Sequence, residues 1–466
     1  MKYALKIFAM FIFTFPGLTS LFSMQLEDSA KTDSTRKIYI SKIIITGNDV
    51  TDERVILREM ENQEGKPIDV EQLQYDLENV YNTGLFTKVD VTPVPVGEDS
   101  LTLLIDVEET FYILPIPQGG IKEGDLNKIW GGINLKWRNF RGLNETVGLS
   151  FGIGYEPFIR ASYSNPWIGS DKYFISLSGG YAIRNIQDIY IYPPGTIIDK
   201  DTVERYGTTN FDFQANVGRY ITNDLNVSIG LGFHRLHVSD YKPGRTLASN
   251  GTDEYPTASL NSHLDSRDLF SYPSNGAYGN FAIKKFGFAN KYINFNRVSL
   301  DFRKYVPIIP FDNYTIILAS RVLNAVSWGG NVPPYLKEQF GYGEIIRGWG
   351  EKVFEGDNLL GGFVELRFPI IKPNYIQGKY LPIIKSISFL KGLSYKYGLY
   401  LTSFFDIGGV WDKDDNFFET KFRNGYGVGI NAILPFDFVG RMDVSFSKKT
   451  PGETSVDIDF GLSASF

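Results

Sequence analysis

Apolar and polar residues alternate in short segments along most of this chain. Between residues 225 and 233 the odd positions are Leu, Val, Ile, Leu and Phe, and the even positions are Asn, Ser, Gly and Gly. The same alternation recurs in residues 147–155 and 298–302. A period of two places one kind of side chain on each face of a β-strand. Clusters of Gly, Asn, Asp and Pro separate the segments, so residues 112–466 are predicted to form many short antiparallel strands.

A different pattern occupies residues 37–109. One strand is expected first, followed by a helix that opens near Thr51 and by a second, amphipathic helix. Asp69 is a typical N-cap for the second helix, and Gln72 stands at the reciprocal position of a capping box. Two alternating strands follow. This order predicts a small α+β module that is only marginally able to fold alone.

The N-terminus has the features of an export signal. Lys2 and Lys6 precede an apolar run at residues 7–15, and small residues follow. We interpret residues 1–23 as a secretory signal peptide and the polar residues 24–36 as a flexible leader. An N-terminal membrane anchor is the alternative, but the apolar run is shorter than the ~20 residues of a spanning helix.

Composition excludes several kinds of chemistry. The chain has no cysteine, so disulfides, thiolate nucleophiles and cysteine-type metal sites are excluded. His234 and His237 would lie on opposite faces of a strand, so we expect no metal site. No nucleophile, base and orienting group stand in a recognisable arrangement, and we expect neither an enzyme nor a cofactor. The net charge of -6 argues against a nucleic-acid partner.

The alternating segments also occur in soluble β-sandwiches, so other features must decide which face is buried. Three features favour lipid contact: segments of ~10 residues, aromatic residues such as Tyr155 and Tyr173 near segment ends, and many glycines on the polar face. A sheet crosses a bilayer only as a closed barrel, because unpaired backbone groups are costly in hydrocarbon. At roughly 22 residues per strand with its loop, the segment fits about sixteen strands. The predicted fold is an α+β module followed by a 16-stranded antiparallel transmembrane β-barrel.

Two junctions in the small module resemble a known domain. Ile45-Thr46-Gly47-Asn48 and Tyr81-Asn82-Thr83-Gly84-Leu85-Phe86 are similar to the polypeptide-transport-associated (POTRA) domain of outer-membrane assembly proteins. The resemblance implies that the module binds an extended client at an exposed sheet edge. A spacer without client contact is the alternative.

Several motifs in the second part resemble the BamA/TamA family of outer-membrane assembly proteins. In chain order these are Asn165-Pro166-Trp167, Asp265-Ser266-Arg267-Asp268, Ile346-Arg347-Gly348-Trp349, Glu365-Leu366-Arg367-Phe368-Pro369 and Phe404-x-Asp406-x-Gly408. The likeness covers nearly all of the mature chain. It implies a barrel whose long loop, carrying the arginine motif, folds back into the lumen.

The resemblance also implies a partner for this arginine. It pairs Arg347 with Asp406 on the inner wall and gives Glu365 as a second acceptor. A guanidinium group has five donors in a fixed fork that matches carboxylate geometry. Gly348 allows close approach of the backbone, and Trp349 offers a flat surface that can wedge against the wall. Whether the pair only braces the loop or takes part in gating stays open.

The last residues alternate without a slip from Val456 to Phe466. An aromatic residue at the end of an outward-facing strand resembles the signal by which outer-membrane barrels are themselves assembled. That signal indicates location and not activity. Its residues here are Phe460, Gly461, Leu462 and Phe466.

The first barrel strand is expected within residues 131–138, where Ile133, Leu135 and Trp137 would face outward. These three residues are the candidate gate strand. In the BamA/TamA family the seam between the first and last strands opens sideways. An open edge of this kind pairs readily with other chains.

The sequence therefore predicts a bacterial outer-membrane protein with its POTRA domain in the periplasm. Its expected role is to insert β-barrel proteins, or to translocate polypeptides, through a lateral gate. The expected partners are outer-membrane lipids, unfolded β-barrel clients and accessory periplasmic factors or lipoproteins. The alternatives are a two-partner-type secretion pore for a soluble polypeptide and a passive porin.

Overall fold

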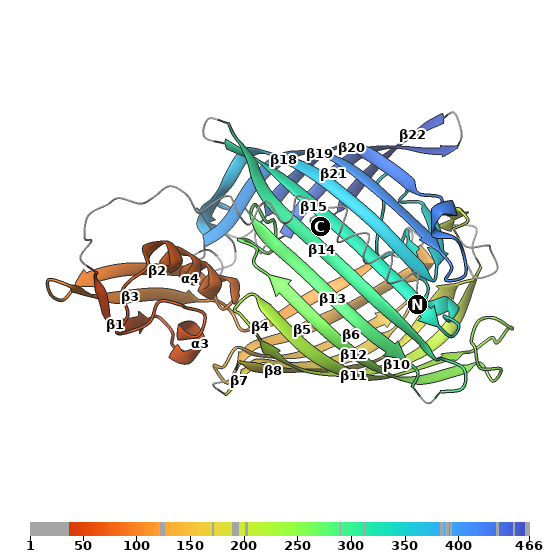
Figure 1. Cartoon of the computed structure of the whole chain (residues 1–466), viewed down its shortest axis with the longest axis horizontal. Coiled ribbons are helices and arrows are strands. Elements are labelled where there is room, and N and C mark those ends of the chain that lie inside the picture. The colour runs from red at the N-terminus through yellow and green to blue at the C-terminus, as the bar shows by residue number, and fades with distance from the viewer. Residues whose placement is uncertain are drawn as a thin grey trace.

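The computed structural model describes residues 37–121, 126–169, 172–188, 195–200, 204–288, 290–311, 314–382, 386, 391, 394–434, 438–450 and 453–461. The predicted signal peptide and leader lie outside these residues, as do Leu462 and Phe466 of the terminal signal. Figure 1 shows a small N-terminal unit beside one end of a large curved sheet.

The small unit has a three-stranded sheet and two helices. Its elements are β1 (Tyr39–Thr46), α3 (Glu53–Leu57), α4 (Val70–Asn82), β2 (Phe86–Pro95) and β3 (Ser100–Glu109), with strand order β1-β3-β2. The pairing of β1 with β3 is parallel, and that of β2 with β3 is antiparallel. Apolar side chains from both layers form its core: Ile40, Val55, Ile56, Leu73, Val80, Leu103 and Ile105.

The start of α4 differs in one detail from the sequence prediction. Asp69 is the N-cap and accepts a hydrogen bond from the Gln72 amide, as expected. The prediction of a reciprocal capping box is wrong. The Gln72 side chain donates to Asp76, and the Asp69 amide donates to the Asn62 side chain. The backbone N–H of Asp69, which would donate to the Gln72 side chain in a capping box, therefore donates to Asn62 instead.

The large sheet contains sixteen strands, and every pairing within it is antiparallel. In sheet order they are β22 (Glu453–Gly461), β21 (Phe438–Thr450), β20 (Arg423–Leu434), β19 (Ser394–Trp411), β18 (Asn358–Gln377), β15 (Tyr314–Gly329), β14 (Phe295–Phe311), β13 (Gly276–Phe286), β12 (Thr252–Asp265), β11 (Leu225–Val238), β10 (Arg205–Tyr220), β8 (Tyr173–Gln187), β7 (Phe158–Ile168), β6 (Glu145–Gly154), β5 (Ile129–Phe140) and β4 (Ile113–Ile121). The 3₁₀ turns are η2 (Leu126–Lys128), η5 (Pro334–Leu336), η6 (Gly378–Tyr380) and η8 (Phe417–Glu419). The predicted strand number and antiparallel fold are confirmed.

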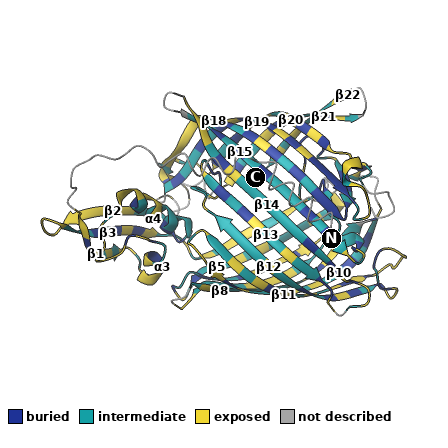
Figure 2. Ribbon diagram, in the orientation of Figure 1, coloured by how far each residue is buried: buried dark blue, intermediate teal, exposed yellow. Residues whose placement is uncertain are grey.

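The apolar face of the sheet points outward. On β11, Ile229 and Leu231 are 64% and 57% exposed, while the alternate residues face the inside of the curved sheet. Figure 2 shows exposed residues alternating with less exposed ones along many strands. A soluble sandwich would bury these side chains against a second sheet. The outward apolar band is instead the arrangement of a membrane barrel. No helix in the described ranges has the length and apolar character needed to cross a bilayer.

The prediction of the first barrel strand is wrong. The terminal strand of the sheet is β4, and Ile133, Leu135 and Trp137 lie on its neighbour β5. They do face outward, with exposed fractions near 40%. Pro115 and Pro117 made β4 difficult to predict from the sequence. Proline has no backbone N–H to donate to a neighbouring strand, so its presence usually argues against a strand. Proline is tolerated here because β4 is an edge strand.

A polar joint attaches the small unit to the barrel. The turn between β5 and β6 presents Asn139, whose amide group donates to Thr51 Oγ1 at 2.9 Å, and Gly142, whose carbonyl accepts from the Asp52 amide at 3.0 Å. Glu109 accepts from the Thr51 amide at 2.7 Å. Burial raises the pKa of Tyr112, whose hydroxyl lies 2.9 Å from Thr51 Oγ1. The joint fixes the small unit at the end of the barrel where β4 begins.

Candidate functional site in the barrel lumen

Residues 330–357, which connect β15 to β18, fold into the lumen from the end opposite the small unit. This segment, here called the luminal loop, contains β16 (Glu338–Phe340) and β17 (Lys352–Gly356). β17 also pairs with β9 (Ile198–Asp199), which joins the loop to a second connection of the barrel. The loop contributes to a buried cluster that includes wall residues of β14, β15, β18 and β19: Tyr305, Ala319, Ala325, Phe340, Ile346, Trp349, Phe354, Leu359, Phe363 and Val410.

Arg347 stands at the tip of the luminal loop and is 2% exposed. Its Nε and Nη2 donate to the two oxygens of Asp406, each at 2.7 Å, and its backbone amide donates to the same carboxylate at 3.1 Å. Its Nη1 donates to Glu365 Oε2 at 2.8 Å. The structure thus brings together the three residues that the sequence analysis paired. Asp406 uses both oxygens in a two-point contact that lysine could not make.

An aromatic ring and a third carboxylate complete the surroundings of the Arg347 guanidinium. Its central carbon lies 3.5 Å from the centre of the Phe404 ring, a distance typical of a cation–π contact. Asp443 on β21 lies 3.9 Å from Arg347 Nη1 and 3.1 Å from Arg441 Nε. Phe404 and Asp406 are two residues apart on β19, so both point into the lumen.

The other residues of the tip motif fix its orientation. Trp349 donates from its indole nitrogen to the Asn424 carbonyl at 2.8 Å and packs edge-on against Phe354. Ile346 is fully buried in the same cluster. Gly348 has φ +87°, a conformation that favours glycine, and its carbonyl accepts from Ser447 Oγ at 2.6 Å. The tip therefore contacts β19, β20 and β21 together.

Close packing explains two wall glycines. A side chain at Gly408 would approach the Phe340 ring to 2.7 Å and Ile346 to 2.8 Å. A side chain at Gly425 would overlap the carbonyl oxygen of Arg347. These contacts account for the glycine in the Phe404-x-Asp406-x-Gly408 motif. Gly425 receives the tip of the loop, a role that no motif in the sequence analysis indicated.

Arg367 is a site residue that the sequence analysis quoted in a motif without giving it a role. It is fully buried, and its Nε donates to Glu365 Oε1 at 2.9 Å. Its Nη1 donates to the Pro273 carbonyl at 2.9 Å, and its guanidinium lies over the Tyr272 ring at 4.1 Å. Glu365 therefore bridges two arginines. The only sequence signal for this role was the spacing of two residues between Glu365 and Arg367, which places both on one face of β18.

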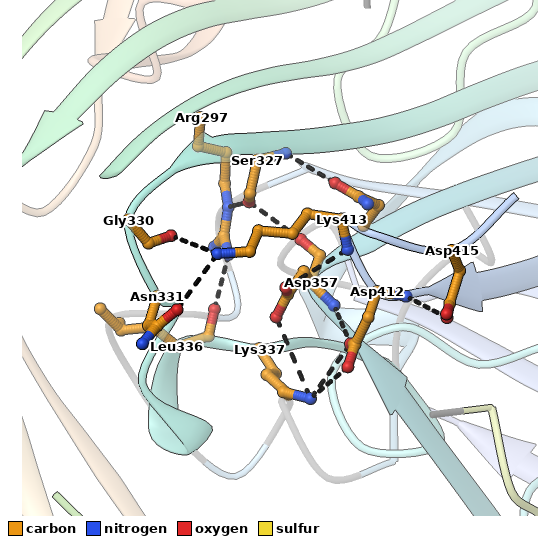
Figure 3. Close-up of polar contacts among 11 residues, drawn as sticks. Arg297, Ser327, Gly330, Asn331, Leu336, Lys337, Asp357, Asp412, Lys413 and Asp415 are labelled. Atoms are coloured by element: carbon orange, nitrogen blue, oxygen red, sulfur yellow. Dashed lines mark hydrogen bonds and ion pairs between the residues drawn. The ribbon is translucent and has the colours of Figure 1, made fainter. Parts of the chain in front are cut away.

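A second set of contacts holds the stem of the luminal loop at the barrel rim (Figure 3). Lys337 Nζ lies 3.1 Å from Asp412 Oδ1 and 4.0 Å from Asp357 Oδ1. Lys413 Nζ donates to the Gly330 carbonyl at 3.0 Å, and Arg297 donates to the Leu336 carbonyl at 2.7 Å. The Asp357 amide donates to Asp412 at 3.0 Å. We call this set, Arg297, Lys337, Asp357, Asp412 and Lys413, the stem clamp.

The described part of the terminal signal lies on the other edge strand. Phe460 is 75% exposed and points outward from β22, and Gly461 packs near Arg441. Among the residues that the structure describes, no group of three or more His, Asp or Glu side chains is placed to hold a metal ion. Buried, charge-matched contacts in the lumen site hold a long loop against four neighbouring strands.

Comparisons with known proteins agree with this architecture. The Omp85 superfamily domain matches residues 139–466, and the surface antigen variable number repeat, a POTRA domain, matches residues 38–110. Outer membrane protein assembly factor BamA of Neisseria meningitidis serogroup B is 28% identical over 223 residues, which are 44% of this chain and 25% of that protein. The chain spans less than half the length of the curated relatives it matches.

Two solved structures have a similar fold. BamA from Haemophilus ducreyi lacking POTRA domains 1-3 superposes with a TM-score of 0.55 at 16% identity, covering 92% of this chain and 84% of that chain. CdiB from Escherichia coli gives a TM-score of 0.58 at 12% identity, covering 91% and 75%. The family match extends over most of the chain. The chain therefore belongs to the Omp85 superfamily, as a bacterial outer-membrane protein with its POTRA domain in the periplasm.

Proposed function

We propose that this protein folds and inserts other β-barrel polypeptides into the outer membrane at the seam between β4 and β22. The observation that carries this proposal is the open order of the sheet. Its sixteen strands run from β22 to β4, and no pairing joins these two strands within the described residues. Backbone groups at such edges pair readily with an added strand.

The free energy for this activity would come from the client. A client strand would pair its backbone with a neighbouring strand and turn its apolar face to lipid. Its backbone N–H and C=O groups would then be hydrogen-bonded and not left unpaired in the bilayer. No nucleotide, cofactor or covalent chemistry is required, and we propose a non-enzymatic role. The lumen site supports it by holding the luminal loop against β18–β21, the wall next to β22.

The proposed partners are outer-membrane lipids on the outward apolar band and unfolded β-barrel polypeptides at the seam. The POTRA domain would receive the client, or accessory periplasmic factors or lipoproteins, at a free edge of its sheet. β1 and β2 are the two edge strands, since β3 lies between them. β2 is the proposed binding edge, because the backbone at Ile38 and Ile40 already bonds to residues 65–68. The similarity to an assembly factor supports this reading, although the chain corresponds to only part of that relative.

Reconstitution tests the proposal. The purified chain in liposomes should accelerate folding of a urea-unfolded outer-membrane barrel protein at least tenfold over liposomes that contain an unrelated porin. Folding is followed by heat-modifiable migration in gels. A large steady conductance without acceleration would contradict the proposal and favour a passive porin. Import of a soluble polypeptide into the liposomes without acceleration would favour a secretion pore.

A further inference from the structure

The connection between β19 and β20, residues 412–422, folds back over the outer face of the barrel. We call it the rim loop. A side chain added at Gly409 would lie 3.0 Å from the Thr420 methyl carbon and 3.2 Å from the Phe422 ring. Gly409 belongs to the outward face of β19, because its neighbour Gly408 packs against the luminal loop and successive strand residues alternate. The end of the rim loop therefore covers the outside of the wall.

An aromatic cluster forms where the rim loop meets this outer face. Trp411, the last residue of β19, contacts Phe417 edge-on, with the ring centres 5.1 Å apart. Phe417 in turn contacts Phe418 at 5.5 Å and Phe422 at 6.0 Å. Trp411 is only 6% exposed, whereas Phe418 is 80% exposed. The cluster thus covers Trp411 and presents Phe418 at its surface.

The exposure of Phe418 is built into a capped turn. Phe418 is the middle residue of η8, and Asn416 is the N-cap of this turn. The Asn416 side chain accepts from the Phe418 amide at 3.2 Å and donates to Glu419 Oε1 at 3.0 Å. An aromatic ring held in water forgoes the free energy of burial, so a ring fixed at this position calls for an apolar partner.

The aromatic cluster continues the apolar band that faces lipid. Phe405 and Ile407 on β19 and Tyr426 and Val428 on β20 are exposed on the outward face, and Phe405 pairs with Tyr426. Phe422 lies four residues before Tyr426, on the same face and nearer the rim. Aromatic residues are enriched where a membrane barrel meets the lipid–water interface. The band and the cluster therefore form one apolar surface, which fits lipid.

The first residues of the rim loop hold the luminal loop (Figure 3). Asp412 follows Trp411 directly, and its Oδ1 accepts from the Asp357 amide at 3.0 Å. The Lys413 amide donates to Asp357 Oδ2 at 3.3 Å. A side chain added at Gly356, the last residue of β17, would lie 2.8 Å from the Trp411 backbone nitrogen. Trp411 therefore has its ring against the aromatic cluster and its backbone against the luminal loop.

We infer that the rim loop binds the acyl-chain boundary of the outer leaflet through Phe418, and that this contact keeps the stem clamp in place. The occupant is lipid, because the cluster is continuous with the surface that already faces the bilayer. The state of the outer leaflet then acts on the luminal loop through Asp412 and Lys413, without any ligand in the lumen. This lipid contact does not depend on the proposed insertion of client barrels.

Fluorescent labels on single cysteines test the lipid contact, because the natural chain has no cysteine. F418C and D414C chains, each labelled with nitrobenzoxadiazole, are reconstituted in phosphatidylcholine liposomes with and without doxyl-labelled lipid. Asp414 is an exposed residue of the same loop, so D414C is the matched control. Quenching by doxyl lipid should be about threefold stronger at F418C, because only this label reaches the acyl chains. Equal quenching at both positions overturns the inference. Disulfide-linked pairs of unlabelled F418C chains, without quenching of the label, would assign this surface to a second copy and also overturn it.

Hydrogen exchange in liposomes tests the link to the luminal loop. Phe418→Asp should raise exchange at the Asp357 amide about fivefold, because a charged side chain is costly at the acyl boundary and the rim loop loses its lipid contact. Phe418→Leu keeps an apolar side chain and should retain the natural rate. Tyr241→Asp, at an exposed aromatic residue of the loop between β11 and β12 on the same rim, is the control and should change nothing.

Two results would overturn the link. Unchanged exchange in Phe418→Asp overturns it even where the F418C label is quenched by lipid. Equal exchange in Phe418→Asp and Phe418→Leu also overturns it, because contacts of the aromatic ring within the protein, and not lipid, would then hold the stem clamp.

Discussion

At the residue scale, the lumen site is a set of alternating charges that are almost completely desolvated. Arg347 and Arg367 share Glu365, and Arg347 also binds Asp406. Burying each group alone would cost several kcal/mol, and only matched partners with good geometry offset that cost. Substitution of any one of these residues should therefore destabilise the protein, because it leaves a buried charge without its partner.

A double-mutant cycle tests this coupling. Arg347→Ala and Asp406→Ala should each lower the free energy of unfolding of the detergent-solubilised protein by about 3 kcal/mol. The double variant should lose little more than either single variant, because the same interaction is removed. Urea titration of heat-resistant migration measures the losses. Arg160→Ala, which breaks a more exposed lumen pair with Asp212, should cost less than about 1 kcal/mol. Additive losses at Arg347 and Asp406 would contradict the coupling.

The glycine at the receiving wall gives a second prediction. Gly425→Ala should displace the tip, because the added methyl group overlaps the Arg347 carbonyl oxygen. Trypsin should then cleave after Arg347, a bond that is buried in the natural protein, at least tenfold faster by mass spectrometry. Gly343→Ala is the matched control, since an added methyl group there meets nothing within 4 Å. Equal cleavage of the two variants would show that the tip is not held at Gly425.

At the element scale, the luminal loop is held at two separate places. The tip is fixed by buried ion pairs on β18 and β19, and the stem by the stem clamp at the rim. The short strands β16 and β17 lie between them and supply few backbone bonds of their own. A loop of this length stays ordered because both anchors offset its conformational entropy.

The stem clamp can be weakened on its own. Lys337→Met should increase amide hydrogen exchange of β16 and β17 about tenfold, a change on the order of 1.4 kcal/mol, because Asp357 and Asp412 lose their shared cation. Arg347 should remain resistant to trypsin. Lys421→Met, at an exposed position near the same rim, is the control. Exchange that rises equally in both variants would mean that the clamp does not hold the loop.

At the scale of the whole molecule, the POTRA domain and the barrel meet through the β5–β6 turn and neighbouring turns of the barrel. The β5–β6 turn fits against residues 50–52, and Trp167 on the barrel lies 5.1 Å from the Arg58 guanidinium. Residues of α4 and of the barrel turns near Tyr220 and Asp265 line one cavity between the two parts. These contacts build the placement of the POTRA domain against the end of the barrel into the fold.

The joint is tested by two matched turn glycines. Gly142 and Gly169 both have positive φ, +74° and +68°, so alanine strains both turns alike. Only at Gly142 would the new methyl group overlap a POTRA atom, the Val50 carbonyl oxygen. Gly142→Ala should raise hydrogen exchange at the Asp52 amide at least tenfold, and Gly169→Ala should leave it unchanged. Similar exchange in both variants would mean that the turn does not anchor the POTRA domain.

Much of the architecture could be predicted from local patterns. Alternation with a period of two determined which residues face lipid, as on β11, and the helix-capping residue Asp69 marked the start of α4. The resemblance of the motifs around Arg347 and Asp406 to the BamA/TamA family implied their pairing across 59 positions of sequence, and a buried guanidinium does require a carboxylate. These features depend on side-chain chemistry and on the spacing of residues, and both can be read from the sequence.

Other features were decided only by the tertiary structure. Pro115 and Pro117 fit into β4 because it is an edge strand, with a paired neighbour on one side only. The sequence of β4 alone does not show which strands lie at the edge. Gly425 packs against the Arg347 carbonyl, and Arg367 donates to the Pro273 carbonyl. Both contacts are with segments that are remote in sequence. The sequence by itself determined an inside-out sheet with an arginine-bearing loop. Only the folded chain decided where the sheet ends and which wall receives the loop, because both are properties of contacts between strands and not of any one strand.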